Sequence, residues 1–280
     1  MRYLDIALPT NKLLLTSCWH IGNPSINEDG INLFLERAKT TPWVHLGDGI
    51  EAITPTDPRF SMGTHAMSVM AQADYFASLM SEAKNTCIGL SVGNHEWKLS
   101  AKIGNVTGMI CKMAGIKYLS GAAYATMKVN GGVSTAFFAH GGGTMGFRAG
   151  EPERRKTNKK VRLRDILKPF DADLKAIGHF HTTVLAPPVF EDRLNHKFRP
   201  RCVKPGWCVA TPSMFGNYGA EDEAELASDE AMPSYAEIQL YPPTRLGWVE
   251  IEFDDDGKVL CARDISECGR VREEVREDYI

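Results

Sequence analysis

Five short segments of the chain carry residue types that bind metal ions. Each follows a short apolar run with the pattern of a buried strand. Neutral imidazole is the commonest metal ligand in proteins, and a carboxylate with two free oxygens can bridge two cations. We therefore interpret the segments as parts of one metal site. They are Cys18-Trp19-His20, Asp48, Asn94-His95-Glu96, His140 and His179-Phe180-His181.

The apolar runs and the stretches between them predict alternating strands and helices. The expected strands are 13–16, 43–46, 88–92 and 174–177, and the expected helices are 27–40 and about 64–84. In layered α/β folds, strand ends and the loops beyond them bring separate segments to one site. On an extended segment, His179 and His181 would present both imidazoles on the same face. We expect His45, His65 and His196 to be structural.

The remaining segments predict antiparallel strands. Runs at 124–129 and 133–139 flank Asn130-Gly131-Gly132, a hairpin signal. Further strands are expected at 236–240 and 247–253, broken by an acidic loop at 221–230. Without a repeat or a Pro-rich linker, residues 1–265 are predicted to form one domain of two packed sheets with flanking helices. The charged tail, 266–280, is expected to be a solvated helix or a frayed end.

Composition describes an ordinary globular chain. The 280 residues are 43% hydrophobic, with a net charge of -3, which excludes disordered and fibrous classes. No apolar stretch approaches the roughly 20 residues of a membrane span, and the N-terminus lacks the apolar core of a signal peptide. We expect a cytosolic protein with no membrane partner. The seven cysteines are scattered without a CxxC pair, which predicts reduced thiols.

The blocks around the candidate ligands resemble, in order and spacing, the motifs of the calcineurin-like metallophosphoesterase superfamily. A weaker likeness to phage-encoded and prophage-encoded members lies in Tyr235-Ala236-Glu237 and Pro242-Pro243-x-x-Leu246-Gly247. The main resemblance covers about residues 13–182. It implies a four-layer α/β-β/α sandwich of two mixed sheets flanked by helices. The five blocks are Ser17-x-x-His20, Gly47-Asp48-x-x-Glu51, Gly93-Asn94-His95-Glu96, His140-Gly141-Gly142 and Gly178-His179-x-His181.

The resemblance also implies hydrolysis of a phosphate ester with two divalent metal ions, which are manganese, zinc or iron. Two close cations lower the pKa of a shared water, so that a bridging hydroxide can attack phosphorus. His95 would protonate the leaving oxygen, with Glu96 holding its ring. Asp48 would bridge the cations. The first would take His20, Asp48, His181 and residue 18, and the second Asp48, Asn94, His140 and His179.

Position 18 departs from the family pattern, which usually has aspartate there. Cys18 is either a thiolate ligand, which favours softer ions such as zinc or iron over manganese, or a buried thiol that leaves the first cation weakly held. A third alternative is a protein that has lost catalysis and kept the fold for binding. We favour the ligand, because the other candidate ligands are intact.

A basic stretch precedes the last block and bears on the substrate. Residues 154–168 contain eight basic residues and one acid, which is typical either of a solvated helix face or of a polyanion contact. The second interpretation assigns substrate binding to Arg154, Arg155, Lys159 and Lys160, and favours a phosphodiester of DNA, RNA or a nucleotide. The alternatives are a phosphomonoesterase and an inactive binding protein. Trp19, Trp97 and Met145 either line a pocket for a planar group or pack in the core.

Overall fold

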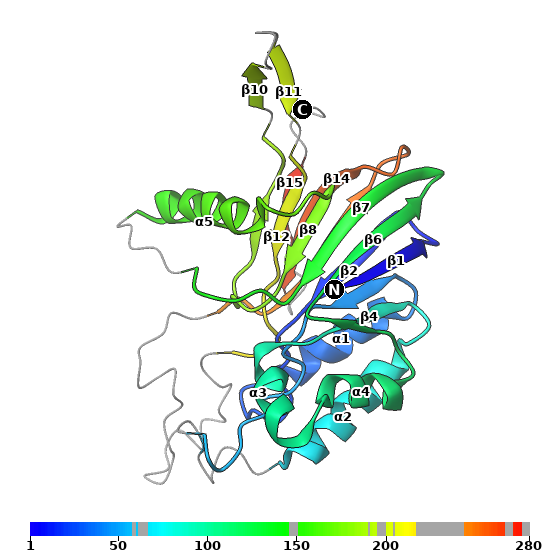
Figure 1. Cartoon of the computed structure of the whole chain (residues 1–280), viewed down its shortest axis with the longest axis vertical. Helices are drawn as coiled ribbons and strands as arrows, with labels where there is room; N and C mark the ends of the chain where they lie inside the picture. The colour runs from blue at the N-terminus through cyan, green and yellow to red at the C-terminus, as the bar shows by residue number, and fades with distance from the viewer. Residues whose placement is uncertain are drawn as a thin grey trace.

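Two mixed β-sheets lie face to face between two groups of helices (Figure 1). The computed structural model describes residues 1–57, 60, 67–145, 151–189, 191–194, 200–203, 205–216, 244–266 and 271–275. Helices α1–α4 lie together on one side of the pair of sheets, and α5 lies on the other. This is the four-layer α/β arrangement of two mixed sheets that the sequence predicts.

The seven-stranded sheet has the order β15-β14-β13-β2-β3-β4-β5. Neighbours from β2 to β5 run parallel, whereas β13, β14 and β15 add antiparallel strands to the free side of β2. The parallel strands β2 to β5 contribute to the candidate site, because their carboxyl ends lie at the same edge of the sheet. The bounds are β2 Lys12–Thr16, β3 Trp43–His45, β4 Cys87–Ser91, β5 Tyr118–Ser120, β13 Gly247–Phe253, β14 Val259–Ser266 and β15 Val271–Val275.

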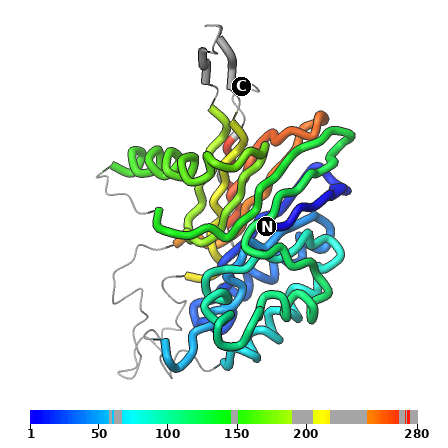
Figure 2. The backbone as a smooth tube through the Cα atoms, viewed as in Figure 1, coloured from blue at the N-terminus to red at the C-terminus, as the bar shows by residue number. Residues whose placement is uncertain are grey.

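The six-stranded sheet has the order β1-β6-β7-β8-β12-β9. Its first strand, β1, pairs in parallel with β6 although more than a hundred residues separate them, and Figure 2 shows the N-terminal segment beside the hairpin of β6 and β7. Strands β7, β8 and β12 are mutually parallel. The bounds are β1 Arg2–Ala7, β6 Ala122–Val129, β7 Gly132–Ala139, β8 Leu174–Ile177, β9 Val184–Ala186 and β12 Trp207–Ala210; a separate antiparallel pair is β10 Glu191–Leu194 and β11 Pro200–Val203.

The side chains of each strand point alternately to the two faces of its sheet, and this explains how the sheets and helices form layers. In β2, Leu13 and Leu15 belong to the cluster between the two sheets, whereas Leu14 packs toward α1–α4. Successive side chains of a strand point to opposite faces, so a strand covered on both sides is apolar throughout. In the other sheet, Phe138 faces the middle layer and Phe137 faces the cluster under α5. The continuous apolar runs of the sequence are therefore strands buried on both faces.

Helices α1, α2 and α4 begin at polar side-chain caps and bury a largely apolar stripe. The Asn27 side chain accepts a hydrogen bond from the Gly30 N–H at the start of α1, and Ser68 and Asn105 cap α2 and α4 in the same way. In α5, only Leu163 and Leu167 are buried. The bounds are α1 Glu28–Ala38, α2 Val69–Glu82, α3 Asn94–Ile103, α4 Val106–Ala114 and α5 Pro152–Leu167.

Most elements expected from the sequence are present. The hairpin turn places Asn130 and Gly131 at positive φ, the geometry that a tight type I′ turn needs. The expectation of a helix or frayed end in the tail is wrong for residues 271–275, which pair with β14 as an edge strand. The sequence analysis did not predict β1, β5, α3 or α4, and β12, in a region expected to hold antiparallel strands, pairs in parallel with β8. Predictions for His65, His196, 221–230, 236–240 and the motifs at 235–237 and 242–243 lie outside the described residues.

Two further expectations concern thiols and membranes. Where the structure describes a cysteine side chain, the thiol is free; these residues are Cys18, Cys87, Cys111, Cys208 and Cys261. In the described ranges, we find no helix long and apolar enough to cross a membrane.

Candidate metal centre

The five candidate segments meet where parallel strands of both sheets end. Strands β2, β3 and β4 are parallel neighbours in one sheet and lead to the segments that begin at Cys18, Asp48 and Asn94. Strands β7 and β8 are parallel neighbours in the other sheet and lead to His140 and His179. Because the two sheets are stacked, their carboxyl ends face one another across a single region.

The donor atoms form three overlapping groups. In each, the candidate ligand atoms lie within 4.8 Å of one another. Cys18 belongs to two of the groups and therefore lies between them. The groups are Cys18, His20 and His181; Cys18, Asp48 and His140; and His20, Glu51 and His95.

Short contacts define the geometry of the first two groups. The Nε2 atoms of His20 and His181 are 3.2 Å apart. On the other side of Cys18, Nε2 of His140 lies 3.0 Å from Oδ2 of Asp48 and 2.9 Å from Oδ1 of Asn94. Nitrogen, oxygen and sulfur donors thus face a common centre.

The backbone at the candidate ligands is unusual. Five of them have positive φ: Cys18 (55°), His20 (51°), Asp48 (53°), His179 (66°) and His181 (48°). The left-handed region is uncommon for non-glycine residues and costs on the order of 1–3 kcal/mol each. Strain of this kind persists where the surrounding structure over-determines it, which is typical of functional sites.

Two glycines allow the strand ends to approach closely. A Cβ on Gly93 would lie 2.1 Å from the backbone nitrogen and from Oδ1 of Asp48, and a Cβ on Gly47 would lie 2.8 Å from the Gly93 nitrogen. The Gly47 φ of 98° also favours glycine. The two glycines therefore let the loops that carry Asp48 and Asn94 pack directly against each other.

Glu51 organises two histidine rings. Its Oε2 lies 2.7 Å from Nδ1 of His20, and its backbone carbonyl lies 2.5 Å from Nδ1 of His95. A carbonyl only accepts hydrogen bonds, so Nδ1 of His95 carries the proton. With Nδ1–H of His20 donated to the carboxylate, Nε2 of His20 is the ring nitrogen that faces His181. The sequence analysis included Glu51 in a motif but assigned it no role.

The electrostatics of the cluster favour charged donors. Burial raises the pKa of the Cys18 thiol, but nearby His181 and His20 outweigh burial and hold that pKa well below its usual value. Burial opposes ionisation of Asp48 as well, yet its hydrogen bond with His140 lowers the pKa of the carboxyl. The same contact outweighs burial at His140 and raises its pKa to about 9. A thiolate and a carboxylate therefore lie among imidazoles.

Glu96 has a different role from the one expected. Its carboxylate accepts hydrogen bonds from the backbone N–H groups of Gly49, Ile50 and Gly93, at 2.6, 3.2 and 3.0 Å. Burial and nearby Asp48 raise the pKa of Glu96 to about 7. The expectation that Glu96 holds the His95 ring is wrong, because the Glu51 carbonyl binds that ring. Glu96 instead fixes the loop that carries Asp48.

The two histidines of the last segment diverge. Both lie in the left-handed region, so the expectation of an extended segment with both rings on one face is wrong. The His181 ring contacts the His20 ring, whereas the His179 ring lies 5.2 Å from that of His140. The Nε2 atom of His179 is 3.1 Å from the Gly143 carbonyl, and His179 is outside the three donor groups.

The basic residues lie on α5, and only part of that helix approaches the cluster. The Lys159 ammonium donates to Oγ1 of Thr182, the residue after His181, at 3.2 Å. Burial and neighbouring Arg155 lower the pKa of Lys159. Lys160 pairs with Glu274 on β15 at 2.8 Å, so its charge is engaged within the fold. Arg154 and Arg155 are exposed.

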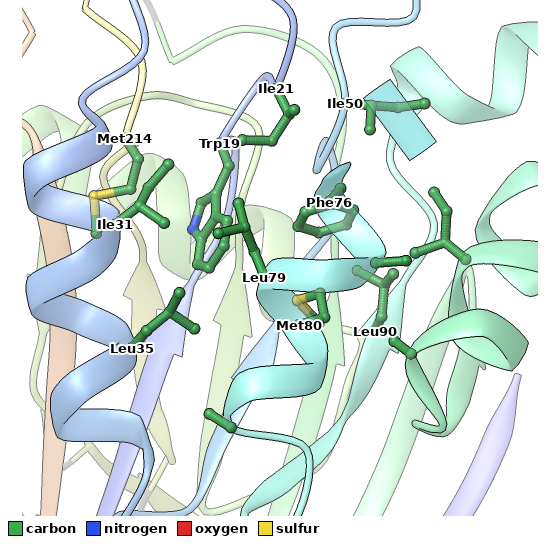
Figure 3. Close-up of a cluster of buried hydrophobic side chains, with 14 of the residues drawn as sticks. Trp19, Ile21, Ile31, Leu35, Ile50, Phe76, Leu79, Met80, Leu90 and Met214 are labelled. Atoms are coloured by element: carbon green, nitrogen blue, oxygen red, sulfur yellow. The ribbon is translucent and has the colours of Figure 1, made fainter. Parts of the chain in front are cut away.

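The three residues suggested for a planar pocket separate. Trp19 is fully buried among side chains of α1 and α2 (Figure 3), with its indole N–H bonded to Thr16. Met145 is buried in the cluster under α5. The planar-pocket interpretation is therefore wrong for these two. Trp97 is 65% exposed.

The donor set fits a divalent cation of borderline softness. Imidazole, thiolate and carboxylate are the ligands that bind zinc and iron. The facing Nε2 atoms of His20 and His181 beside the low-pKa thiol of Cys18 supply such a set. Asp48, His140 and Asn94 supply a second set rich in oxygen. The buried donors are consistent with bound metal ions.

Fold and site together define an α/β protein of two mixed sheets with a candidate metal centre at the strand ends. No protein-family model matches the chain, and no curated protein matches it in sequence. A similar solved structure is that of YfcE, a phosphoesterase from E. coli, with 14% identity and a TM-score of 0.43 over 94% of this chain and 98% of that chain. This likeness is too distant to determine an activity.

Proposed function

We propose that the chain is a metal-dependent phosphoesterase that hydrolyses a phosphodiester of a nucleic acid or a nucleotide. The observation that carries the proposal is the convergence of the donors of Cys18, His20, Asp48, His140 and His181 in overlapping groups within 4.8 Å. Four of the five motif blocks that resemble calcineurin-like metallophosphoesterases supply those donors. We propose two divalent cations at this centre.

Bound cations would polarise the phosphoryl oxygens and make hydroxide available at neutral pH. Cys18, His20, His181 and Asp48 would hold one cation. Asp48, Asn94, His140 and His179 would hold the other, once the His179 ring leaves the Gly143 carbonyl. Glu51 keeps Nε2 of His20 directed at the centre, and Glu96 keeps the loop of Asp48 in place.

His95 is the candidate for proton transfer. Its Nδ1–H is held by the Glu51 carbonyl, which leaves Nε2 as the atom that exchanges a proton with the leaving oxygen. The backbone N–H of His95 donates to Oδ1 of Asp48 at 2.9 Å. His95 is therefore fixed relative to a proposed ligand through both its backbone and its ring.

The test compares an aryl phosphodiester with the matching monoester as manganese, zinc or iron is returned to metal-free protein. Asp48→Asn should abolish turnover, whereas the same change at exposed Asp171 should leave it intact. Metal-dependent hydrolysis of the diester supports the proposal. Hydrolysis of the monoester alone identifies a phosphomonoesterase, and metal binding without turnover of either ester, or of DNA, identifies a binding protein.

We propose further that the Cys18 thiolate binds the first cation. In protein loaded with cobalt, it should give a thiolate-to-cobalt charge-transfer absorption in the near ultraviolet. Cys18→Ser should remove this absorption and about one equivalent of bound metal, while Cys111→Ser, a buried thiol of α4, should change neither. An unchanged spectrum and metal content in Cys18→Ser would refute the assignment.

Substrate contact is proposed for the basic face of α5. Lys159, whose ammonium lies beside Thr182, and Arg155, one helical turn away, lie on one side of the helix, and Arg154 and Lys160 lie on either side of that pair. Phosphate contacts make DNA affinity fall steeply as salt rises. Replacing the four residues with Ala should weaken DNA binding and flatten its salt dependence, whereas Lys112→Ala on α4 should not. Unchanged DNA binding in the fourfold variant would exclude this surface.

A further inference from the structure

Trp97 differs from every other tryptophan of the chain. It is 65% exposed, and the other four, Trp19, Trp43, Trp207 and Trp248, are at most 2% exposed. In the described part of the chain, no aromatic ring contacts the Trp97 indole and no group hydrogen-bonds to it. Leaving a large apolar ring in water is unfavourable, so this indole offers a surface to a ligand.

The helix places that indole beside the candidate metal centre. Helix α3 begins at Asn94, whose Oδ1 lies 2.9 Å from Nε2 of His140. Trp97 is three residues further on, and residues three apart are neighbours on a helix surface, with about 5–6 Å between their Cβ atoms. Helical side chains lean toward the N-terminus of their helix. The indole therefore leans toward the end of α3 that carries Asn94.

The face of α3 that carries Trp97 is open to solvent. The buried residues of the helix are His95, Glu96 and Leu99, whereas Trp97 and Lys98 are exposed. Proteins that bind single-stranded nucleic acids combine aromatic rings, on which the bases stack, with positively charged side chains that contact the phosphates. A basic side chain near the candidate ligands is Lys159, whose ammonium donates to Thr182.

We propose that Trp97 stacks on a nucleobase attached to the scissile phosphodiester, which makes nucleotides and single-stranded nucleic acids the substrate class of this centre. The inference rests on the proposed phosphoesterase function for its catalytic consequence. Stacking itself needs only the exposed indole, so binding and turnover can be tested separately.

Binding is measured with metal-free, full-length protein by acrylamide quenching of tryptophan fluorescence. Because the other four indoles are buried, the quenchable emission comes from Trp97. Hexathymidylate should protect that emission, and an abasic hexamer with the same phosphates should not. Thymidine monophosphate distinguishes a free nucleotide from a strand. Because the variants lack the reporter indole, their affinity is measured by the fluorescence anisotropy of dye-labelled hexathymidylate. Loss of stacking should weaken binding by about 5- to 150-fold in Trp97→Ala, and Trp97→Phe should retain most of the affinity.

Turnover is measured after metal is restored. Trp97→Ala should raise KM for a thymidine phosphodiester and leave KM for a dialkyl phosphodiester unchanged. Ile103→Ala, which truncates an exposed apolar side chain at the other end of α3, is the matched control and should alter neither. Equal protection by both hexamers, or equal KM changes for both diesters, would overturn the inference. Base-dependent protection without hydrolysis of any ester would support stacking and refute the phosphoesterase.

Discussion

His45 should make the stability of this protein depend on pH in a way that one substitution can isolate. The ring is fully buried and packs edge-on against Trp19 and Phe76, with centroids 5.1 and 5.2 Å apart. Its Nδ1 accepts a hydrogen bond from the Gly47 N–H at 3.1 Å. Protonation would put a charge in an apolar environment and remove this acceptor, and burial accordingly lowers the pKa of His45 from 6.5 to about 3.

The direction of the effect follows from proton binding. Below pH 6.5 the unfolded chain takes up a proton at His45 that the folded chain does not, so the free energy of unfolding falls as pH falls from 6.5 toward 3. Each pH unit in this window corresponds to about 1.4 kcal/mol. The contribution of His45 between about pH 7.5 and about pH 5 is therefore about 2 kcal/mol.

His45→Asn is the variant that separates titration from structure. The amide oxygen of Asn can accept the Gly47 N–H as Nδ1 does, but the side chain does not titrate. Urea unfolding followed by tryptophan fluorescence should show wild type losing about 2 kcal/mol more stability than the variant across that interval. If the two proteins lose the same amount, His45 is not held neutral by burial and the reasoning is wrong.

Two further predictions concern the metal centre. Glu51→Gln removes the charge that orients His20 and should weaken metal binding by about 10- to 100-fold in a chelator competition, with exposed Glu36→Gln as the control; unchanged affinity would show that Glu51 does not support the ligand. Gly93→Ala places a methyl group against the backbone of Asp48. It should lower the free energy of unfolding in urea by about 1–3 kcal/mol and reduce the amount of bound metal. Gly121→Ala, where a Cβ would have no atom within 4 Å, should do neither, and a Gly93→Ala protein with unchanged stability and metal content would contradict the close approach.

Cys18 gives the centre a chemical character of its own. Its sulfur belongs to both the group with His20 and His181 and the group with Asp48 and His140. A thiolate between two sets of donors favours softer cations than a carboxylate would at the same place. Cys18→Asp should therefore shift metal preference toward manganese, as measured by metal content after loading with equal zinc and manganese.

Local patterns in the sequence were enough to predict the positions of many strands and of the candidate ligands. Runs such as Leu13–Leu15 are apolar because their strands are covered on both faces, so their positions could be read without the partners. The candidate ligands follow such runs directly, as Asp48 follows β3 and His140 follows β7. Strand ends gather at one edge in this class of fold, and residue type and position were therefore enough to predict a common region.

Tertiary structure decided how those residues contact one another, because the contacts join segments far apart in the chain. The Glu51 carbonyl, not Glu96, binds the His95 ring, and the Glu96 carboxylate binds backbone N–H groups of a different loop. Residues in similar sequence positions also differ in burial. Trp19 and Trp97 each follow a candidate site residue, yet Trp19 is buried and Trp97 is exposed. Such outcomes depend on which helix covers each side chain, and periodicity along one segment carries no information about that.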